Sequence, residues 1–150
     1  MNLRIDFSEL KYFLSEIDRL KQNARYNLLN TTETIMENMK DRISDGLDMN
    51  GNTVSTFSAR QIGNYSERHG LIRQRAGKQT AKVDFQFSGQ LFDNITVEQR
   101  GVNTVVGGIQ GDRNVLVANE NEDYFEKVIF TPSDAEIEKE LDEMLNSLFK

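Results

Sequence analysis

Carboxylate pairs and a single histidine are the side chains of this sequence that are best suited to acid–base chemistry. Glu136 and Glu140 stand four residues apart, a spacing that places both side chains on the same face of a helix. Acids spaced in this way without a nearby base usually form a solvated surface, so we expect no catalysis there. His69 has no second histidine to work with, and a lone histidine in a polar segment is more often a surface residue than a catalyst.

Two segments superficially fit ligand-binding loops. Residues 107–111 are rich in glycine, yet they lack the Lys-Ser or Lys-Thr ending of a phosphate loop and the spacing of a dinucleotide-binding fingerprint. Around Gly51, oxygen-bearing side chains alternate as in a calcium loop, but the spacing to a terminal bidentate glutamate is absent, so we predict a turn. The side chains around Gly51 are Asp45, Asp48, Asn50 and Asn52.

The scarcity of cysteine and histidine limits which metal sites and catalytic mechanisms this chain could support. The chain contains no cysteine, which excludes disulfides and thiolate metal sites, and one histidine cannot build a zinc site of several histidines. A small hydrolase is the least supported function, because no credible pair of nucleophile and base is present. We therefore expect no metal, no cofactor and no enzymatic activity.

Charge is distributed unevenly along the chain, whose net charge is −6. Residues 60–82 contain six bases against one acid, and residues 118–146 contain ten acids against two bases, which gives net charges of +5 and −8. Two solvated surfaces would account for this pattern, but opposite surfaces on two copies can also meet head to tail and close into a ring. The side chains that we predict for such an interface are Arg60, Arg68, Arg73, Arg75, Lys78, Lys82, Glu136, Glu140 and Glu143.

Length and composition are typical of one globular domain. The chain has 150 residues, of which 37% are hydrophobic, and this is enough for a single core that spans residues 1–150. No window approaches 18 consecutive apolar residues, so we expect no contact with a membrane. A cleaved signal peptide needs an uninterrupted apolar stretch near the N-terminus, and Asp6 and Glu9 interrupt it here, so we expect no signal peptide.

Apolar periodicity predicts two helices at the N-terminus. The first, amphipathic helix is predicted by apolar residues that recur at spacings of three, four and three: Phe7, Leu10, Leu14 and Ile17. A second helix is expected from about residue 22 to residue 45, with Gly46 as its stop signal.

A long glycine-rich loop is expected next, over about residues 46–81, with a short helix near residues 59–68. Alternating apolar residues predict a strand at 83–87, followed by a helical turn through Leu91 and Phe92. A hairpin signal follows at 95–106, around the Arg-Gly-Val-Asn segment that begins at residue 100. Residues 115–118 fit either a helix or a strand.

The C-terminal part of the chain predicts one more strand and a final helix. Residues 128–130 resemble a strand, and the helix is expected to start with Thr131 as N-cap and Pro132 in the first helical position. The resulting fold class is α+β, a small antiparallel sheet packed by two N-terminal helices and a C-terminal helix. The apolar stripe of that last helix comprises Ile137, Leu141, Met144, Leu145 and Leu148.

Four short segments occur in a recognisable order. They are Asp-Gly-Leu-Asp-Met-Asn-Gly-Asn at 45–52, Phe-Ser at 57–58, Tyr-Ser-Glu-Arg-His-Gly at 65–70 and Val-Asp-Phe-Gln-Phe-Ser-Gly-Gln-Leu-Phe-Asp-Asn-Ile at 83–95. Together with the hairpin that follows, this order resembles that of bacteriophage virion-morphogenesis proteins, the group that completes tails and joins heads to tails. The similarity extends over roughly residues 42–148.

The resemblance implies a structural role in a virus particle. Such a protein is a non-enzymatic subunit of the neck or tail end, located in the virion and, during assembly, in the host cytoplasm. It forms a homo-oligomeric ring, commonly sixfold, between the connector and the tail. Its implied partners are copies of itself and other phage neck, connector and tail proteins, with contact to packaged DNA as a further possibility.

A nucleic-acid-binding accessory protein is the alternative that the residues leave open. In that case the basic loop at 60–82 would bind phosphates, although the sequence carries no aromatic series and no recognised reader motif. Binding that falls steeply with salt would favour this second function.

Overall fold

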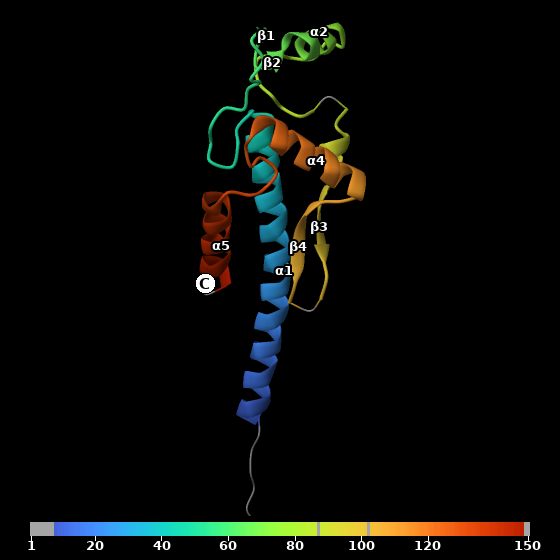
Figure 1. Ribbon diagram of the computed structural model, residues 1–150. Helices are drawn as coiled ribbons and strands as arrows, with labels where there is room; N and C mark the ends of the chain where they lie inside the picture. Colours follow the sequence, from blue (N-terminus) through green and yellow to red (C-terminus); the bar gives the residue numbers. More distant parts are fainter. Residues whose placement is uncertain (1–7, 87, 102, 149–150) are drawn as a thin grey trace, which may run out of the picture.

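A single long helix forms the spine of the molecule. In a computed structural model that describes residues 8–86, 88–101 and 103–148, helix α1 runs without a break over Ser8–Ser44. Its 37 residues correspond to a length of about 55 Å. Figure 1 shows the other elements gathered around the C-terminal half of α1, while the N-terminal half projects beyond them.

The prediction of two separate N-terminal helices is therefore wrong. Residues 18–21 (Asp-Arg-Leu-Lys) lie between the two predicted helices, but they include no glycine or proline that would end a helix. Most of these residue types are good helix formers, so the helix continues through them. Phe7 and the side chain of Leu10, which were expected in the first helix, lie outside the described part of the chain.

Two elements cover opposite sides of α1. On one side, β3 (Ile95–Gln99) and β4 (Val105–Ile109) form an antiparallel hairpin, with Ile95 paired to Ile109. On the other side, α5 (Asp134–Leu148) runs antiparallel to α1 (Figure 1). The hairpin lies very close to α1, because a Cβ atom at Gly107 would stand only 2.9 Å from Met36 Sδ.

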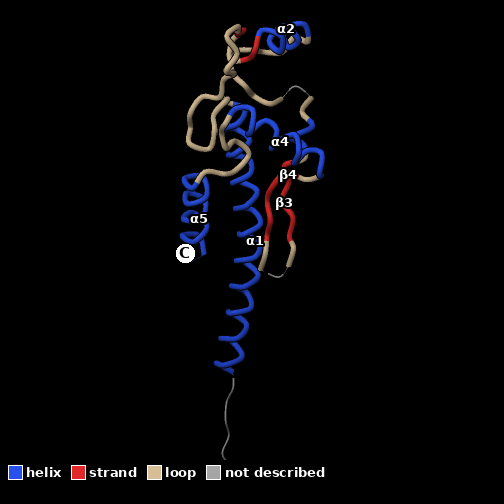
Figure 2. The backbone as a smooth tube through the Cα atoms, in the orientation of Figure 1, coloured by secondary structure: helices blue, strands red, loops and turns tan. Residues whose placement is uncertain are grey.

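The remaining elements cap the C-terminal end of α1, as Figure 2 shows. Helix α4 (Asp112–Phe125) crosses near this end, and α3 (Gln90–Asp93) is a single turn before the hairpin. Residues 60–82 form a small projection that we call the basic knob. It contains the two-stranded pair β1 (Gln61–Ile62) and β2 (Tyr65–Ser66) and the helix α2 (Glu67–Arg75).

The hydrophobic core lies where these elements meet α1. It draws side chains from the C-terminal half of that helix, from the hairpin, from the end of α4 and the segment after it, and from β2 and the loops on either side of the basic knob. Its buried members are Ile35, Met36, Met39, Ile43, Val54, Tyr65, Val83, Ile95, Phe125 and Ile129.

The α+β fold class is confirmed, and so are the hairpin, the helical turn at Leu91 and the C-terminal helix. Residues 115–118 lie in a helix, α4. The glycine-rich segment at 46–81 is not one continuous loop, since the basic knob folds within it. The short helix within it occupies Glu67–Arg75 rather than residues 59–68.

Both additional strands are wrong, because their backbones do not pair with another strand within the described residues. At 83–87, Phe85 has a positive φ of 54°, which breaks an extended strand, and its ring packs edge-on against Phe125 and Phe130. Phe87 lies outside the described residues. At 128–130, Ile129 is buried, but its N–H and that of Phe130 donate to the Glu122 carboxylate instead of a strand.

The start of α5 also differs from the prediction. Ser133, not Thr131, caps the helix: Ser133 Oγ accepts a hydrogen bond from the Glu136 N–H at 3.2 Å, and Glu136 Oε2 accepts one from the Ser133 N–H at 2.6 Å. This reciprocal pair is a capping box. Pro132 consequently stands before the cap instead of in the first helical position.

Replacing the cap residue tests this assignment. We expect Ser133→Ala to lower the free energy of unfolding by about 1 kcal/mol, because one N–H at the helix start loses its acceptor. Thr131→Ala is the matched control and is expected to change stability by less than about 0.5 kcal/mol, since Thr131 is exposed. Urea denaturation of both variants decides between the two caps, and a larger loss at Thr131 would contradict the structure.

Candidate functional site

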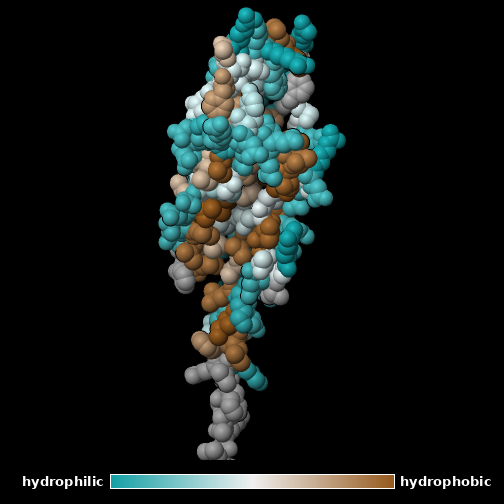
Figure 3. Space-filling view, in the orientation of Figure 1, coloured by the Kyte–Doolittle hydropathy of each residue, from teal (hydrophilic) through white to brown (hydrophobic). Residues whose placement is uncertain are grey.

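The projecting half of α1, residues 11–26, exposes large apolar side chains. Phe13 is 61% exposed and Leu20 is 48% exposed, although both lie in the middle of regular helix. Among the described residues, the α1–α5 hydrogen bond nearest the N-terminus of α1 joins Asn27 Nδ2 to Ser147 Oγ, which lie 3.4 Å apart. Figure 3 shows hydrophobic side chains along this part of the helix. The other exposed large apolar residues here are Tyr12, Leu14 and Tyr26.

The basic knob presents three of its six bases freely. Arg68, Arg75 and Lys78 are exposed and form no ion pair with any described residue. Arg60 lies 3.8 Å from Glu67, and Lys82 contacts Asp45 at 2.6 Å, both at the surface. The exposed bases give this end of the molecule its positive charge.

Arg73 is the exception, because it is a structural residue of the knob and only 1% exposed. Its Nη2 atom donates to both carboxylate oxygens of Asp84, at 2.9 and 3.0 Å, and its Nε atom donates to the Gln79 carbonyl at 2.7 Å. The guanidinium carbon lies 4.6 Å from the centre of the Tyr65 ring, in cation–π contact. Arg73 is therefore not available on the surface where the interface was predicted.

Asp84 joins the two sides of this cluster. Its carboxylate also accepts hydrogen bonds from Tyr65 Oη, at 3.2 Å, and from the Gln79 side chain. Burial alone would raise the pKa of Asp84, but the hydrogen bonds from Gln79 and the Gln86 backbone and the charge of Arg73 together hold that pKa below its ordinary value. Burial raises the pKa of Tyr65 to about 12, and the Asp84 charge adds to this shift.

The acids predicted for the interface are partly used within the molecule. Glu136 Oε1 accepts from Arg42 Nε at 2.9 Å, and Glu140, which is buried, accepts from Asn38 Nδ2 at 3.0 Å. These contacts fasten α5 to α1. Glu143 is exposed and only loosely paired, with Lys139 at 3.9 Å.

The turn around Gly51 is organised by protein groups. Asp48 Oδ1 accepts from the backbone N–H groups of Asn50 and Asn52, and Asp48 Oδ2 accepts from Lys127 Nζ at 2.6 Å. Across the described ranges, no group of three or more His, Cys, Asp or Glu side chains is placed to hold a metal ion. No helix in the same ranges is long and apolar enough to cross a membrane.

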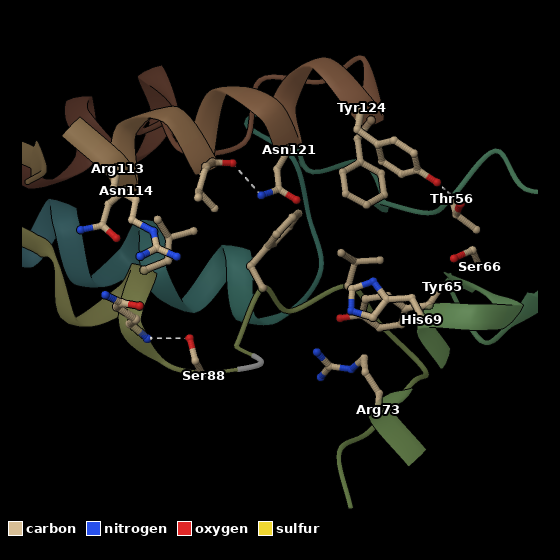
Figure 4. Close-up of a pocket in the computed structure, with 16 residues that line it drawn as sticks. Thr56, Tyr65, Ser66, His69, Arg73, Ser88, Arg113, Asn114, Asn121 and Tyr124 are labelled. Atoms are coloured by element: carbon tan, nitrogen blue, oxygen red, sulfur yellow. Dashed lines mark hydrogen bonds between the residues drawn. The ribbon is translucent and has the colours of Figure 1, made fainter. Parts of the chain in front are cut away.

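A cavity of about 570 Å³ lies between the basic knob and α4 (Figure 4). Its apolar lining includes the rings of Phe85 and Tyr124, and Tyr124 Oη shares a 2.7 Å hydrogen bond with Thr56 Oγ1. His69 also lines the cavity; burial lowers its pKa, as does the charge of Arg73, and both effects favour the neutral imidazole. The lining combines aromatic rings with a few polar groups.

No protein-family model matches this sequence, and no curated protein or solved structure is significantly similar to it.

Sequence reasoning located the charged surfaces but missed the Arg73 cluster. Two members of this cluster, Tyr65 and Asp84, do fall within the segments on which the family resemblance is based. Their contact with Arg73 depends on a chain reversal through residues 76–82, which no local spacing reveals. The cavity depends on the same fold-back.

Removing the Asp84 charge should expose how much the knob depends on this cluster. We expect Asp84→Asn to lower the free energy of unfolding by about 3 kcal/mol, because the buried Arg73 guanidinium loses its counter-charge. Arg75→Gln, a change at an exposed base of the same helix, is the control and should alter stability by less than about 0.5 kcal/mol. Equal effects of both changes in urea denaturation would contradict a structural role for the pair.

The same variant has a pH signature. Because the pKa of Asp84 is lower in the folded chain than in the unfolded chain, the unfolded chain takes up a proton first as the pH falls. The stability contributed by Asp84 is therefore present above about pH 4 to 5 and is lost as the pH falls through the folded pKa. The stability difference between the wild type and Asp84→Asn should shrink over that range.

Proposed function

We propose that this protein is a structural subunit of a tailed-bacteriophage particle that assembles with copies of itself into a ring at the neck or tail end. The projecting half of α1 carries this proposal. Large apolar side chains gathered on one exposed helix mark an interaction surface, since a monomer in water gains nothing from displaying them. The order of the four short segments, which resembles that of virion-morphogenesis proteins, supports a phage particle as the place where this subunit assembles.

The charge distribution supports assembly between copies. Arg68, Arg75 and Lys78 are exposed on the basic knob, whereas Glu138, Asp142 and Glu143 are exposed on α5. In Figure 1 the knob and α5 occupy different parts of the molecule, so the two surfaces do not neutralise each other within one copy. A subunit with two unlike surfaces forms heterologous contacts, which close into a ring under cyclic symmetry.

Nucleic-acid binding is the second candidate, favoured by the three unpaired bases of the knob. Such bases attract phosphates, and their affinity falls as salt rises because counterions compete. Contacts from such bases to phosphates position a protein on a duplex but do not read its base sequence. We therefore rank this function below self-assembly.

A polar substitution on the projecting helix tests the first proposal. We expect Leu20→Ser to shift the protein toward monomer, because the variant removes a large apolar group from the association surface. Size-exclusion chromatography with light scattering measures the mass, and negative-stain imaging of the wild type shows the ring. A wild type that remains monomeric at high concentration would contradict the proposal.

Tyr26→Ser provides the matched control for that experiment. Tyr26 is 66% exposed on the same helix, but around the helix axis it points opposite to Ile17 and about 120° away from Leu20. We expect this change to leave assembly intact. Both variants should retain the wild-type stability as monomers, since neither side chain packs in the core.

Charge reversal on the knob separates the two candidate functions. We expect Arg75→Glu combined with Lys78→Glu to weaken assembly, with the largest effect at low salt, where charges are least screened. Binding of the wild type to a DNA duplex is measured in parallel by filter binding. Strong DNA binding that this variant abolishes, with assembly unchanged, would favour the nucleic-acid function instead.

A further inference from the structure

Four apolar side chains of the projecting half of α1 follow a seven-residue repeat. Phe13, Ile17, Leu20 and Ala24 are spaced by four, three and four residues, which is the spacing of the two apolar positions, a and d, of a coiled coil. Ile17 and Ala24 occupy a, and Phe13 and Leu20 occupy d. These four side chains form a continuous seam along about 17 Å of helix.

The seam continues a contact surface that already exists within the molecule. The next d position after Leu20 is Asn27, whose side chain contacts Ser147 at the end of α5. From Asn27 onward, this side of α1 is covered by α5, through contacts at Asn38 and Arg42. A helix packed at the seam would therefore extend the α1–α5 interface toward the N-terminus.

Charges on the two flanks of the seam identify its occupant. Glu16 lies in the g position on one flank, and Lys21 lies in the e position on the other. In parallel, in-register helices, the g residue of one helix faces the e residue five positions later in its neighbour, and Lys21 is five positions after Glu16. In an antiparallel arrangement, g residues face g residues and e residues face e residues, so Glu16 and Lys21 would not meet.

We propose that the projecting half of α1 packs in parallel against the same segment of a second copy, with Phe13, Ile17, Leu20 and Ala24 in the seam and Glu16 paired with Lys21 of the neighbour. This inference rests on the proposed self-assembly and specifies which surface makes the contact. Helices related by a rotation axis that runs along them are parallel, so the arrangement agrees with a ring.

The monomer presents this segment ready for pairing. Short helices are marginal in water on their own, but residues 11–26 extend a helix that is anchored in the core, so association need not first form the helix. Glu16 contacts Arg19 at 2.8 Å and Lys21 contacts Asp18 at 3.9 Å within one chain. These exposed intrahelical pairs contribute little, so both charges are able to exchange partners.

Charge swapping in the full chain tests the orientation. Glu16→Lys and Lys21→Glu each place like charges opposite one another between parallel copies, and we expect each to weaken association roughly tenfold at low salt. The double variant restores opposite charges, so its association constant should return to within about threefold of the wild-type value. Sedimentation of all four proteins at low and high salt gives these constants.

Cysteine crosslinking supplies an independent readout, because the chain contains no native cysteine. Ala24→Cys places a thiol in the seam, where parallel copies bring equivalent residues together, and we expect a disulfide-linked dimer under mild oxidation. Tyr26→Cys, on the opposite side of the helix, is the control and should remain uncrosslinked. Circular dichroism verifies that each variant keeps its helix content.

The outcomes of these experiments distinguish the parallel seam from the proposed self-assembly on which it rests. If the wild type assembles but single charge reversals have no effect, or the double variant stays as weak as either single one, the parallel seam is overturned while self-assembly stands. The same holds if Tyr26→Cys crosslinks as well as Ala24→Cys. A wild type that is monomeric at every concentration overturns both.

Discussion

The fixed attachment of α5 to α1 is the contact on which the rest of the structure depends. Arg42 binds Glu136 and also donates to the carbonyls of Ile129 and Thr131, so it fixes the segment that leads into α5. Asn38 holds Glu140 one turn further along. Because these groups are largely withdrawn from water, losing one partner leaves a polar atom unsatisfied, which specifies a single register for the two helices.

That register also determines which part of α1 is left without tertiary contacts. Helix α5 contains 15 residues and α1 contains 37, so an antiparallel pair that begins at Arg42 ends near Asn27. The hairpin is shorter still and covers the opposite side at Met36. The apolar face of α1 continues past both elements, and its remaining part is the surface to which we assign assembly.

Local sequence signals predicted the elements that depend on local spacing. The hairpin at 95–109, the turn at Leu91 and the final helix follow from periodicity and glycine placement, and all three are present. Short apolar runs were not sufficient to define strands. Ile129 is buried as such a run predicts, but its backbone binds the Glu122 side chain, a choice that depends on α4 being already in place.

Charge counting has a similar limit. It located a basic and an acidic segment, but it could not show which charges are consumed inside one copy. Arg73 is neutralised by Asp84, and Glu136 by Arg42 of α1, 94 positions away in the chain. Glu140 is buried against α1, where it accepts a hydrogen bond from Asn38, 102 positions away. The apolar spacing of the seam on α1 is local and can be predicted from the sequence. Only the fold shows that no other described element covers the seam.

Hydrogen–deuterium exchange at increasing protein concentration tests the central claim most directly. In the monomer, the amides of residues 11–26 belong to a helix without tertiary cover and should exchange rapidly, whereas those near Met39 should be protected. We predict that protection of residues 11–26 rises with concentration as the mass of the particle rises. Exchange in that segment that stays fast while the protein assembles would show that its contacts lie elsewhere.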